Sequence, residues 1–245
     1  MNGVIIYFSG TGNTKLIVNN FNKVFQQKNI TLDILSIEKN ADSIHSKYDF
    51  IIIGFPNYFG RAPTFFLNYL KEQVPNTNES IPVGIFCTES IPDSTSFKEV
   101  EEIMLSKNYQ ILLNEHFHMP NNLNIDEVTK IVNGDVVHEK IFSKINLFAE
   151  NLSLNRKSFE IPNKVSQAFP SIFDNLLVDM NLCIKCRFCL RCCPFDNIIL
   201  DHQKIKILDN CANCMRCVNI CPKNAINFSD KKIKQYKENI GLVIK

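Results

Sequence analysis

The strongest constraint on the fold is a cysteine motif that occurs twice in the last third of the chain. Each copy has three cysteines at three-residue spacing, then a fourth cysteine followed by proline. An internal repeat of this kind predicts two similar units packed about a pseudo-two-fold axis. Three thiols within seven residues also surround a small space, which favours metal binding. The first copy is Cys183, Cys186, Cys189 and Cys193; the second, 28 residues later, is Cys211, Cys214, Cys217 and Cys221.

Two other uses of cysteine fit the pattern less well. Disulfide scaffolds belong to small secreted chains, whereas this chain has 245 residues and its start lacks the basic and long apolar parts of a signal peptide. Zinc sites usually take paired cysteines from two separated hairpins. The spacing here is that of [4Fe–4S] ligand runs, in which the fourth cysteine binds the other cluster. It predicts one cluster on Cys183, Cys186, Cys189 and Cys221, and a second on Cys211, Cys214, Cys217 and Cys193.

Residues 172–230 resemble a bacterial two-cluster ferredoxin, a small α+β domain, with all eight ligand positions matched. Such ferredoxins are commonly acidic, but this segment has seven Lys and Arg against six Asp and Glu. Cations near a cluster favour its more negative reduced state, so we expect reduction potentials above those of acidic ferredoxins. The cations inside the ligand loops are Lys185, Arg187, Arg191 and Arg216.

Cys192 stands beside a ligand but fits no ligand spacing. We expect a partly buried thiol, because cysteine packs as a small apolar side chain. The alternative is a spare ligand or a redox-active thiol.

Residues 1–152 alternate between apolar runs typical of buried strands and amphipathic stretches typical of helices. Buried strands joined by helices predict parallel pairing with right-handed crossovers. We therefore expect an α/β fold with a doubly wound five-stranded parallel sheet. Strands are expected at 4–8, 30–37, 50–54, 83–87 and 109–117, and helices at 14–27, 63–70, 97–105 and 126–152, the last interrupted near Gly134.

A glycine-containing loop follows the first expected strand and opens the first helix. Backbone N–H groups and a helix N-terminus bind anions at such a turn. The loop lacks the lysine of a P-loop, and Lys15 replaces the third glycine of a dinucleotide fingerprint. It therefore suits a phosphate monoester held by neutral donors, the alternative being a plain helix cap. Its residues are Ser9, Gly10, Thr11, Gly12, Asn13 and Thr14.

With this loop, residues 1–152 resemble flavodoxin, in which the equivalent loop binds the phosphate of FMN. The resemblance implies that two further loops contact the flavin ring. Tyr58 or Phe59 would stack on the ring, within the loop Pro56, Asn57, Tyr58, Phe59 and Gly60. Thr88, Glu89 and Ser90 would reach the pyrimidine side, although glycines frequent in the family are missing there.

Two other features lie at the expected carboxyl edge of the sheet. Residues 119–122 are a weaker candidate for the flavin rim. We interpret His116 and His118, which share one face of a strand end, as surface histidines and not as catalytic groups.

Together the two parts resemble the flavodoxin–ferredoxin fusion proteins of anaerobes. We expect a flavodoxin-like domain at 1–152, a linker at 153–171, the two-cluster domain at 172–230 and a basic tail at 231–245. The end of the tail, 240–244, is expected to add an edge strand or to fray. Lys and Arg number 12 against 17 Asp and Glu up to residue 152, a net −5, and 15 against 8 after it, a net +7. Opposite charges would draw the two domains together.

The resemblance implies an electron carrier that passes electrons between two [4Fe–4S] clusters and FMN, linking one-electron and two-electron carriers. The alternative is a flavin-dependent reductase, which a substrate pocket lined by Tyr58, Phe59 and His118 would favour. We expect redox proteins as partners, neither nucleic acid nor membrane, and a cytoplasmic location. No nicotinamide fingerprint and no apolar span of about 20 residues occurs, so neither an NAD(P)H site nor a membrane helix is expected.

Overall fold

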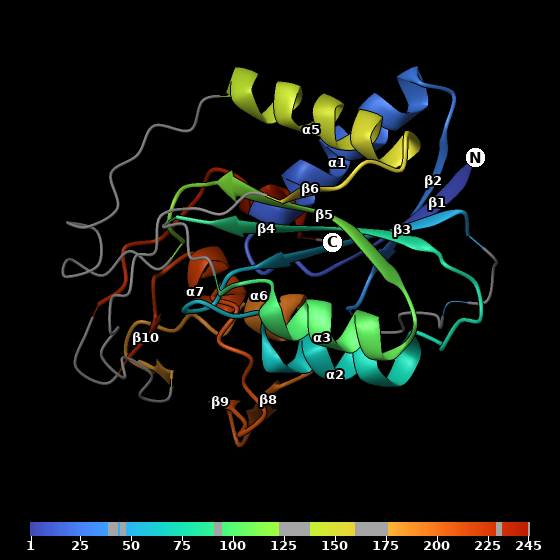
Figure 1. The fold of residues 1–245 in the computed structure, drawn as a ribbon. Coiled ribbons are helices and arrows are strands. Elements are labelled where there is room, and N and C mark those ends of the chain that lie inside the picture. Colours follow the sequence, from blue (N-terminus) through green and yellow to red (C-terminus); the bar gives the residue numbers. More distant parts are fainter. Residues whose placement is uncertain are drawn as a thin grey trace.

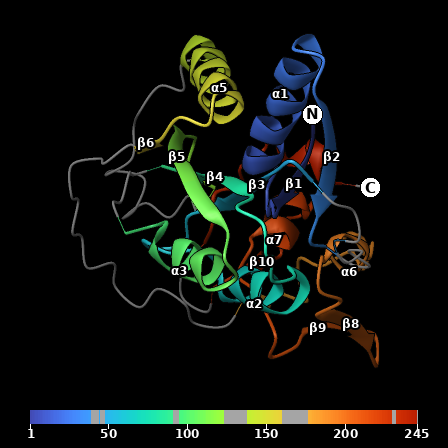
Figure 2. The ribbon, with the colours of Figure 1, turned by 45° about the vertical axis from the view of Figure 1, so that its right-hand side comes forward.

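The computed structural model describes residues 1–38, 44, 48–90, 95–122, 138–159, 176–228 and 232–244. A parallel sheet lies between two layers of helices, and a small C-terminal part lies at the carboxyl edge of that sheet (Figure 1). The two parts are in contact, and Figure 2 shows α7 (Arg216–Ile220) beneath the ends of α1 (Asn13–Gln27) and β1 (Asn2–Tyr7).

The sheet has the strand order β2-β1-β3-β4-β5-β6, with every neighbouring pair parallel. Its strands beyond β1 are β2 (Thr31–Ser36), β3 (Phe50–Pro56), β4 (Pro82–Glu89), β5 (Gln110–His118) and β6 (Ser158–Phe159). Strands β1, β3 and β4 are nearly continuous apolar runs because helices cover both of their faces. The order 2-1-3-4-5 is that of flavodoxin-like doubly wound sheets.

The sheet differs from the expectation in its edge, where β6 adds a sixth strand beside β5. This strand has two exposed residues and therefore no apolar run from which it could be predicted. It lies in the expected linker, whose remainder from residue 160 onward is outside the described residues.

The described helices cover both faces of the sheet (Figure 1). Helices α1 and α5 (His138–Ser153) bury Phe21, Phe25 and Phe148 on one face. Helices α2 (Thr64–Gln73) and α3 (Lys98–Ser106) bury Phe66 and Met104 on the other. The expected helix before residue 138, with its interruption near Gly134, falls outside the described residues.

In the C-terminal part, the backbone conformation repeats together with the cysteine motif. Left-handed φ angles recur 28 residues apart, for example at Arg187 (63°) and Met215 (58°), which precede the two short helices. The antiparallel pair β8–β9 corresponds to the pair β10–β7 in the other unit. The elements are β7 (Leu177–Val178), α6 (Phe188–Cys192), β8 (Ile198–Asp201), β9 (Lys204–Ile207), α7 and β10 (Ile226–Asn227).

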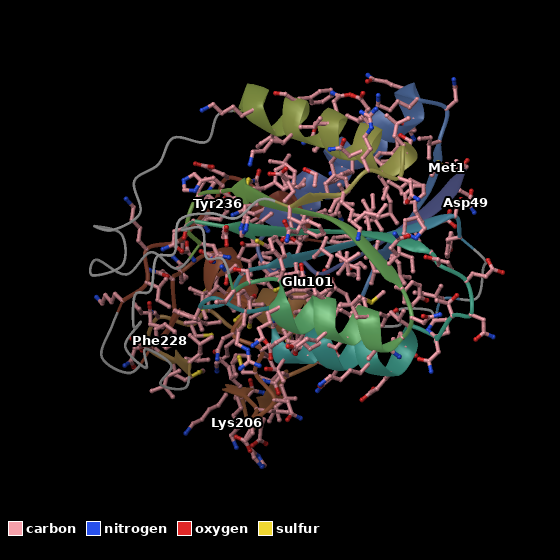
Figure 3. The ribbon with its side chains drawn as sticks, viewed as in Figure 1. Met1, Asp49, Glu101, Lys206, Phe228 and Tyr236 are labelled. Carbon is pink, nitrogen blue, oxygen red and sulfur yellow. The ribbon has the colours of Figure 1, made fainter. Side chains whose placement is uncertain are left out.

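Within the described residues, the end of the C-terminal tail is not an edge strand. Ile240–Leu242 forms a short 3-10 helix, η1. Before it, Tyr236 donates a hydrogen bond to Asn13 Oδ1, and its ring lies on the side of the molecule opposite Met1 (Figure 3). Across the described residues, no helix has the length and apolar character that crossing a membrane requires.

Candidate functional site

A pocket opens at the carboxyl edge of the sheet, where the loops after β1, β3, β4 and β5 meet. This edge is the usual ligand side of an open parallel sheet. The pocket contains about 410 Å³ of empty space, part of which is open to solvent. Its lining is Ser9, Gly10, Thr11, Asn13, Thr14, Pro56, Asn57, Tyr58, Thr88, Glu89, Ser90, Met119, Pro120, Asn121 and Asn122.

The structure thus brings eleven of the fourteen candidate flavin-binding residues to one pocket, together with residues 119–122. Gly12, Phe59 and Gly60 are outside its lining. A Cβ on Gly12 would collide with Asn239 O of the tail. Phe59 is 40% exposed and lines a neighbouring groove between the two parts of the chain.

The loop from Ser9 to Thr14 has the geometry of an anion site. Gly12 has φ 102°, a left-handed conformation that glycine adopts without strain. Ser9 Oγ accepts hydrogen bonds from the N–H groups of Gly12 (3.2 Å) and Lys15 (3.1 Å). Within the described ranges, the N–H groups of Gly10, Thr11, Asn13 and Thr14 have no partner. Free N–H groups at the start of a helix are the donors that a phosphate needs.

Side chains around the loop add neutral donors. Thr11 Oγ1 accepts a hydrogen bond from Asn122 Nδ2 (2.7 Å), which leaves its own hydrogen free to donate to a ligand. Thr14 Oγ1 and Thr88 Oγ1 lie 2.8 Å apart. None of the described residues that line the pocket is a lysine or an arginine. The donor set therefore fits a phosphate monoester such as that of FMN.

Arg216 approaches the other side of this loop from α7. Its buried guanidinium donates hydrogen bonds to Ser9 O (2.8 Å), Gly10 O (2.9 Å) and Cys192 O (3.2 Å), and to both carboxylate oxygens of Glu38 (2.7 and 3.0 Å). Burial disfavours its charge, but the hydrogen bonds and charge of Glu38 outweigh burial and raise the pKa of Arg216. Arg216 therefore links the second cysteine motif to the phosphate loop as a paired cation.

The four cations of the ligand loops thus have different surroundings. Lys185, Arg187 and Arg191 are exposed, and the Arg191 guanidinium lies 4.7 Å from the centre of the Phe188 ring. Arg216 alone among them is buried against Glu38.

The cysteines come together in two groups that cross the repeat. The first group lines one small cavity at the surface. The pKa of the Cys189 thiol is raised to about 11. Burial is the largest cause, and a hydrogen bond from the Leu190 N–H acts in the opposite direction. The thiols of Cys221, Cys183 and Cys186 raise the pKa further. These are the four residues expected to share a cluster: Cys183, Cys186, Cys189 and Cys221.

The second group contains the other four expected ligands. Burial raises the pKa of the Cys217 thiol well above its usual value, and the nearby thiols of Cys214, Cys211 and Cys193 raise it further, as does Cys192. A backbone N–H points at the last cysteine of each motif, from Asn197 to Cys193 Sγ and from Ala225 to Cys221 Sγ, both at 3.3 Å. Hydrogen bonds to ligand sulfur tune cluster potentials.

Cys192 is buried between the two groups. Its Sγ lies 3.6 Å from Cys189 O, and burial raises the pKa of its thiol to about 12. At 9% exposed, and with its Sγ directed at a backbone carbonyl, Cys192 agrees with a packing role.

The second cysteine group lies against the phosphate loop. A Cβ on Gly10 would lie 2.5 Å from Cys214 O and 3.1 Å from Cys214 Cβ, so only glycine permits this approach. Tyr58 is half-buried beside them, and its buried hydroxyl has no hydrogen-bond partner within the described part of the chain. Burial, and after it the Cys214 thiol, raise the pKa of Tyr58. An unpaired buried hydroxyl fits a site completed by a bound group.

Aromatic packing extends the same contact. The ring of Phe195, which follows the first motif, lies 4.5 Å from Phe65 and 5.7 Å from Phe8, measured between ring centres. Phe195 and Cys214 thereby pack on the core of the N-terminal part.

Three titratable side chains that the sequence analysis did not connect lie together beside the pocket. His116 Nδ1 contacts Glu89 Oε1 and lies 3.4 Å from Cys87 Sγ. The expectation that His116 is a surface histidine is wrong, since it is 4% exposed and Phe97 covers its ring at 4.5 Å between centres. His118 is half-buried and outside the pocket lining. Cross-strand pairing of β4 with β5 was the signal that could have connected these residues.

Comparison with known proteins finds two family models on this chain. A flavodoxin domain matches residues 4–137, and a 4Fe-4S dicluster domain matches residues 175–237. No curated protein matches the chain.

Several solved structures are similar to the N-terminal part. A flavodoxin from the domain Archaea is 13% identical, with a TM-score of 0.45 over 63% of this chain and 98% of its own. The flavodoxin of Streptococcus pneumonia TIGR4 is 14% identical, with a TM-score of 0.47 over 63% and 99%. Rubredoxin oxygen:oxidoreductase from Desulfovibrio gigas is 15% identical, with a TM-score of 0.46 over 63% and 35%.

Proposed function

Because the chain belongs to the flavodoxin family over residues 4–137 and carries a 4Fe-4S dicluster domain after it, we propose that it passes electrons between two [4Fe–4S] clusters and FMN. When bound, FMN exchanges two electrons singly and each cluster exchanges one, so the chain would link one-electron and two-electron carriers. The observation that carries the proposal is the contact between the second cysteine group and the phosphate loop at Gly10 and Arg216.

The pocket at the carboxyl edge would hold FMN. Its phosphate is assigned to the free N–H groups of the loop from Ser9 to Thr14 and to the Thr11 hydroxyl. The flavin ring is assigned to the space that Asn57, Tyr58 and Glu89 line. These residues would bind and orient the cofactor, and Arg216 would hold the backbone of the loop through its hydrogen bonds to Ser9 O and Gly10 O.

The clusters are assigned to the two crossed cysteine groups. Cys183, Cys186, Cys189 and Cys221 would hold an outer cluster, since they line a cavity at the surface. Cys193, Cys211, Cys214 and Cys217 would hold an inner cluster, since Cys214 lies against the phosphate loop. Electrons would therefore pass between a partner and FMN by way of the outer and then the inner cluster.

Redox proteins with an acidic surface are the partners that this arrangement favours. Apolar side chains are exposed beside the first cysteine group, with Ile184 at 56% and Phe188 at 44%. Exposed Lys185 and Arg187 stand next to them in the ligand loop. A small apolar contact ringed by cations suits a transient partner with complementary acidic residues.

The alternative of a flavin-dependent reductase has less support. It needs substrate space over the flavin, which we expected to be lined by Tyr58, Phe59 and His118. Tyr58 lines both the flavin pocket and the neighbouring groove, Phe59 lines only the groove, and His118 lines neither. We therefore keep the carrier as the proposed function.

Cofactor counting and single-turnover kinetics test the proposal. Full-length protein purified without oxygen is expected to contain eight irons and one FMN per chain. When oxidised protein is rapidly mixed with dithionite that supplies about two electrons per chain, the cluster absorbance should fall first. The flavin band should then bleach within the same molecule at a rate independent of protein concentration. Eight irons without flavin, or bleaching that rises with protein concentration, would contradict the intramolecular route.

A further inference from the structure

The flavin pocket has a buried acid–base pair on one wall. Glu89 lines the pocket and is 5% exposed, and His116 lies behind it. Neither residue belongs to the phosphate loop or to the cysteine groups. A carboxylate and an imidazole removed from water are costly unless they share a proton.

The sheet register places these groups together. Cys87 on β4 pairs with His116 on β5, and Glu89 follows Cys87 by two residues on the same face. On the side of α3, Phe97 covers the imidazole and Ser96 Oγ lies 3.4 Å from Glu89 Oε2. The pair is therefore closed to solvent on its inner side and reaches the pocket through Glu89.

No lysine or arginine bonds the Glu89 carboxylate among the described residues. Its partners are His116 Nδ1, Asn57 Nδ2 at 2.6 Å and Ser96 Oγ. On β5, Glu115 pairs with Lys144 of α5, whose Nζ also donates to His116 O at 2.9 Å. On the side of α3, Glu99 pairs with Arg61 at the surface. Among the described residues, the Glu89 carboxylate thus contacts the His116 imidazole and no lysine or arginine, and Cys87 is a further titratable neighbour.

We propose that Glu89 and His116 form a proton-transfer site for the flavin. This inference rests on the proposed function, since it takes FMN to occupy the pocket and the clusters to supply two electrons. His116 Nδ1 would give its proton to Glu89, and Glu89 would deliver it to the flavin ring as the electrons arrive. Taken as imidazolium and carboxylate beforehand, the pair would be left with one negative charge and would take the proton back when the flavin is oxidised again.

Asn57 couples this pair to the loop that flanks the ring. Its Nδ2 donates to Glu89 Oε2, and its Oδ1 accepts the N–H of Gly60 at 2.7 Å. The position of the carboxyl group is thereby fixed relative to the loop after β3. General acids placed in this way typically accelerate proton transfer by about 10²–10⁴-fold.

Chemical rescue tests the proposal in the full-length, cofactor-loaded protein. Glu89→Gln keeps the shape of the side chain and an oxygen that can accept the hydrogen bond from Asn57 Nδ2. In this variant, flavin reduction by the clusters is expected to slow by about 100-fold. Small acids such as acetic acid or imidazolium should then restore the rate in proportion to their concentration, whereas the wild type should not respond to them. Glu115→Gln removes the carboxylate of the residue that precedes His116 on β5. It is the matched control, and its rate is expected to lie within about twofold of wild type.

An infrared difference spectrum of reduced minus oxidised protein provides a readout that does not depend on rate. Loss of the Nδ1 proton should give an imidazole band that His116→Asn abolishes and Glu115→Gln retains. If Glu89→Gln fails to fold or to bind FMN, His116→Asn tests the same proton transfer, because it removes the other member of the pair.

Three results separate the outcomes. A wild-type rate in Glu89→Gln with an unchanged spectrum would overturn the proton-transfer site and leave the electron carrier intact. A wild-type protein that lacks flavin would remove the proposed function itself. One tightly held Zn²⁺ per chain that Cys87→Ser releases would assign Cys87, Glu89 and His116 to a metal site and overturn the proposal, because their ligand atoms lie within 4.8 Å of one another.

Discussion

Cys192 and Cys193 are adjacent in the chain, but their thiols have different surroundings. Cys193 Sγ accepts the Asn197 N–H and lies in the second cysteine group. Cys192 Sγ points back toward Cys189 O, and burial raises the pKa of its thiol to about 12. Spacing within the motif, and not the residue type, decides which of the two is available as a ligand.

Replacing each of these cysteines by alanine should separate the two roles. Cys192→Ala is expected to retain eight irons per chain and to lower the free energy of unfolding by about 1 kcal/mol, the usual cost of a small core truncation. Cys193→Ala should lose about half of the iron, since it removes a ligand of one cluster only. Iron analysis of anaerobically purified protein measures both, and loss of iron in Cys192→Ala would make Cys192 a ligand.

Gly10 is a residue whose side chain would stand directly between the two parts of the chain. Gly10→Ala places a Cβ 2.5 Å from Cys214 O, a backbone atom that cannot rotate away. We expect a loss of about 1–3 kcal/mol in stability and slower flavin reduction, because the second cysteine group must shift outward. Gly241→Ala is the matched control, since its Cβ meets nothing within 4 Å. Thermal unfolding and stopped-flow absorbance measure the two effects, and equal behaviour of both variants would refute the close approach.

The residues that could be predicted from the sequence are those with a local signal. Each cysteine motif, like the loop from Ser9 to Thr14, lies within one short backbone segment, so its residues have fixed spacing. Arg216 and His116 had no such signal: Arg216 was one of several basic residues in a ligand loop, and its contact with Glu38 spans 178 residues. Long-range contacts of this kind depend on how the two parts pack, which no local pattern encodes.

At the scale of elements, the tail from residue 232 to 244 connects the phosphate loop to α7. Tyr236 Oη donates to Asn13 Oδ1 at 2.6 Å, and Asn239 Nδ2 donates to the same oxygen at 2.9 Å. The Tyr236 N–H donates to Asn219 Oδ1, on α7, at 2.6 Å. Asn13 is thereby oriented by the tail, with its Nδ2 donating to Pro120 O at 2.9 Å.

Tyr236→Phe tests this role of the tail. The variant keeps the buried ring but removes one hydrogen bond to Asn13, so we expect a loss of about 1 kcal/mol in stability. FMN should bind about five- to tenfold more weakly if that energy is needed to hold the loop in its binding conformation. Lys234→Ala, on the exposed side of the same segment, is the control. Quenching of FMN fluorescence by the flavin-free protein gives the affinities, and equal affinities for both variants would contradict a supporting role.

Elements with a strong apolar pattern were the predictable ones. The strands β1 to β5 and the helices α1, α2 and α3 lie within a few residues of their expected positions, because burial on the sheet imposes a clear periodicity. The tail has no such pattern. It is held by side-chain hydrogen bonds from Gln235, Tyr236 and Asn239, and these leave no periodic signal in a sequence.

At the scale of the whole molecule, the two parts meet through aromatic rings and one buried ion pair. Their contact is made by the rings of Phe195, Phe8 and Phe65 and by buried Arg216 with Glu38. Buried ion pairs are screened little by salt. The exposed cations Lys185, Arg187 and Arg191 lie instead around the first cysteine group, where a partner would dock.

Salt should therefore affect two electron-transfer steps differently. Between 0.05 and 0.5 M NaCl (roughly a threefold change in Debye length), flavin reduction by the clusters is expected to change by less than about twofold. Over the same range, the second-order rate with a reduced acidic ferredoxin as the test partner should fall by at least about tenfold. Lys185→Glu should reproduce much of that loss at low salt, while Lys204→Glu, on strand β9, serves as the charge-matched control. A steep salt dependence of the intramolecular step would support the expected charge attraction between the two parts. Equal losses in the two variants would place the partner elsewhere on the surface.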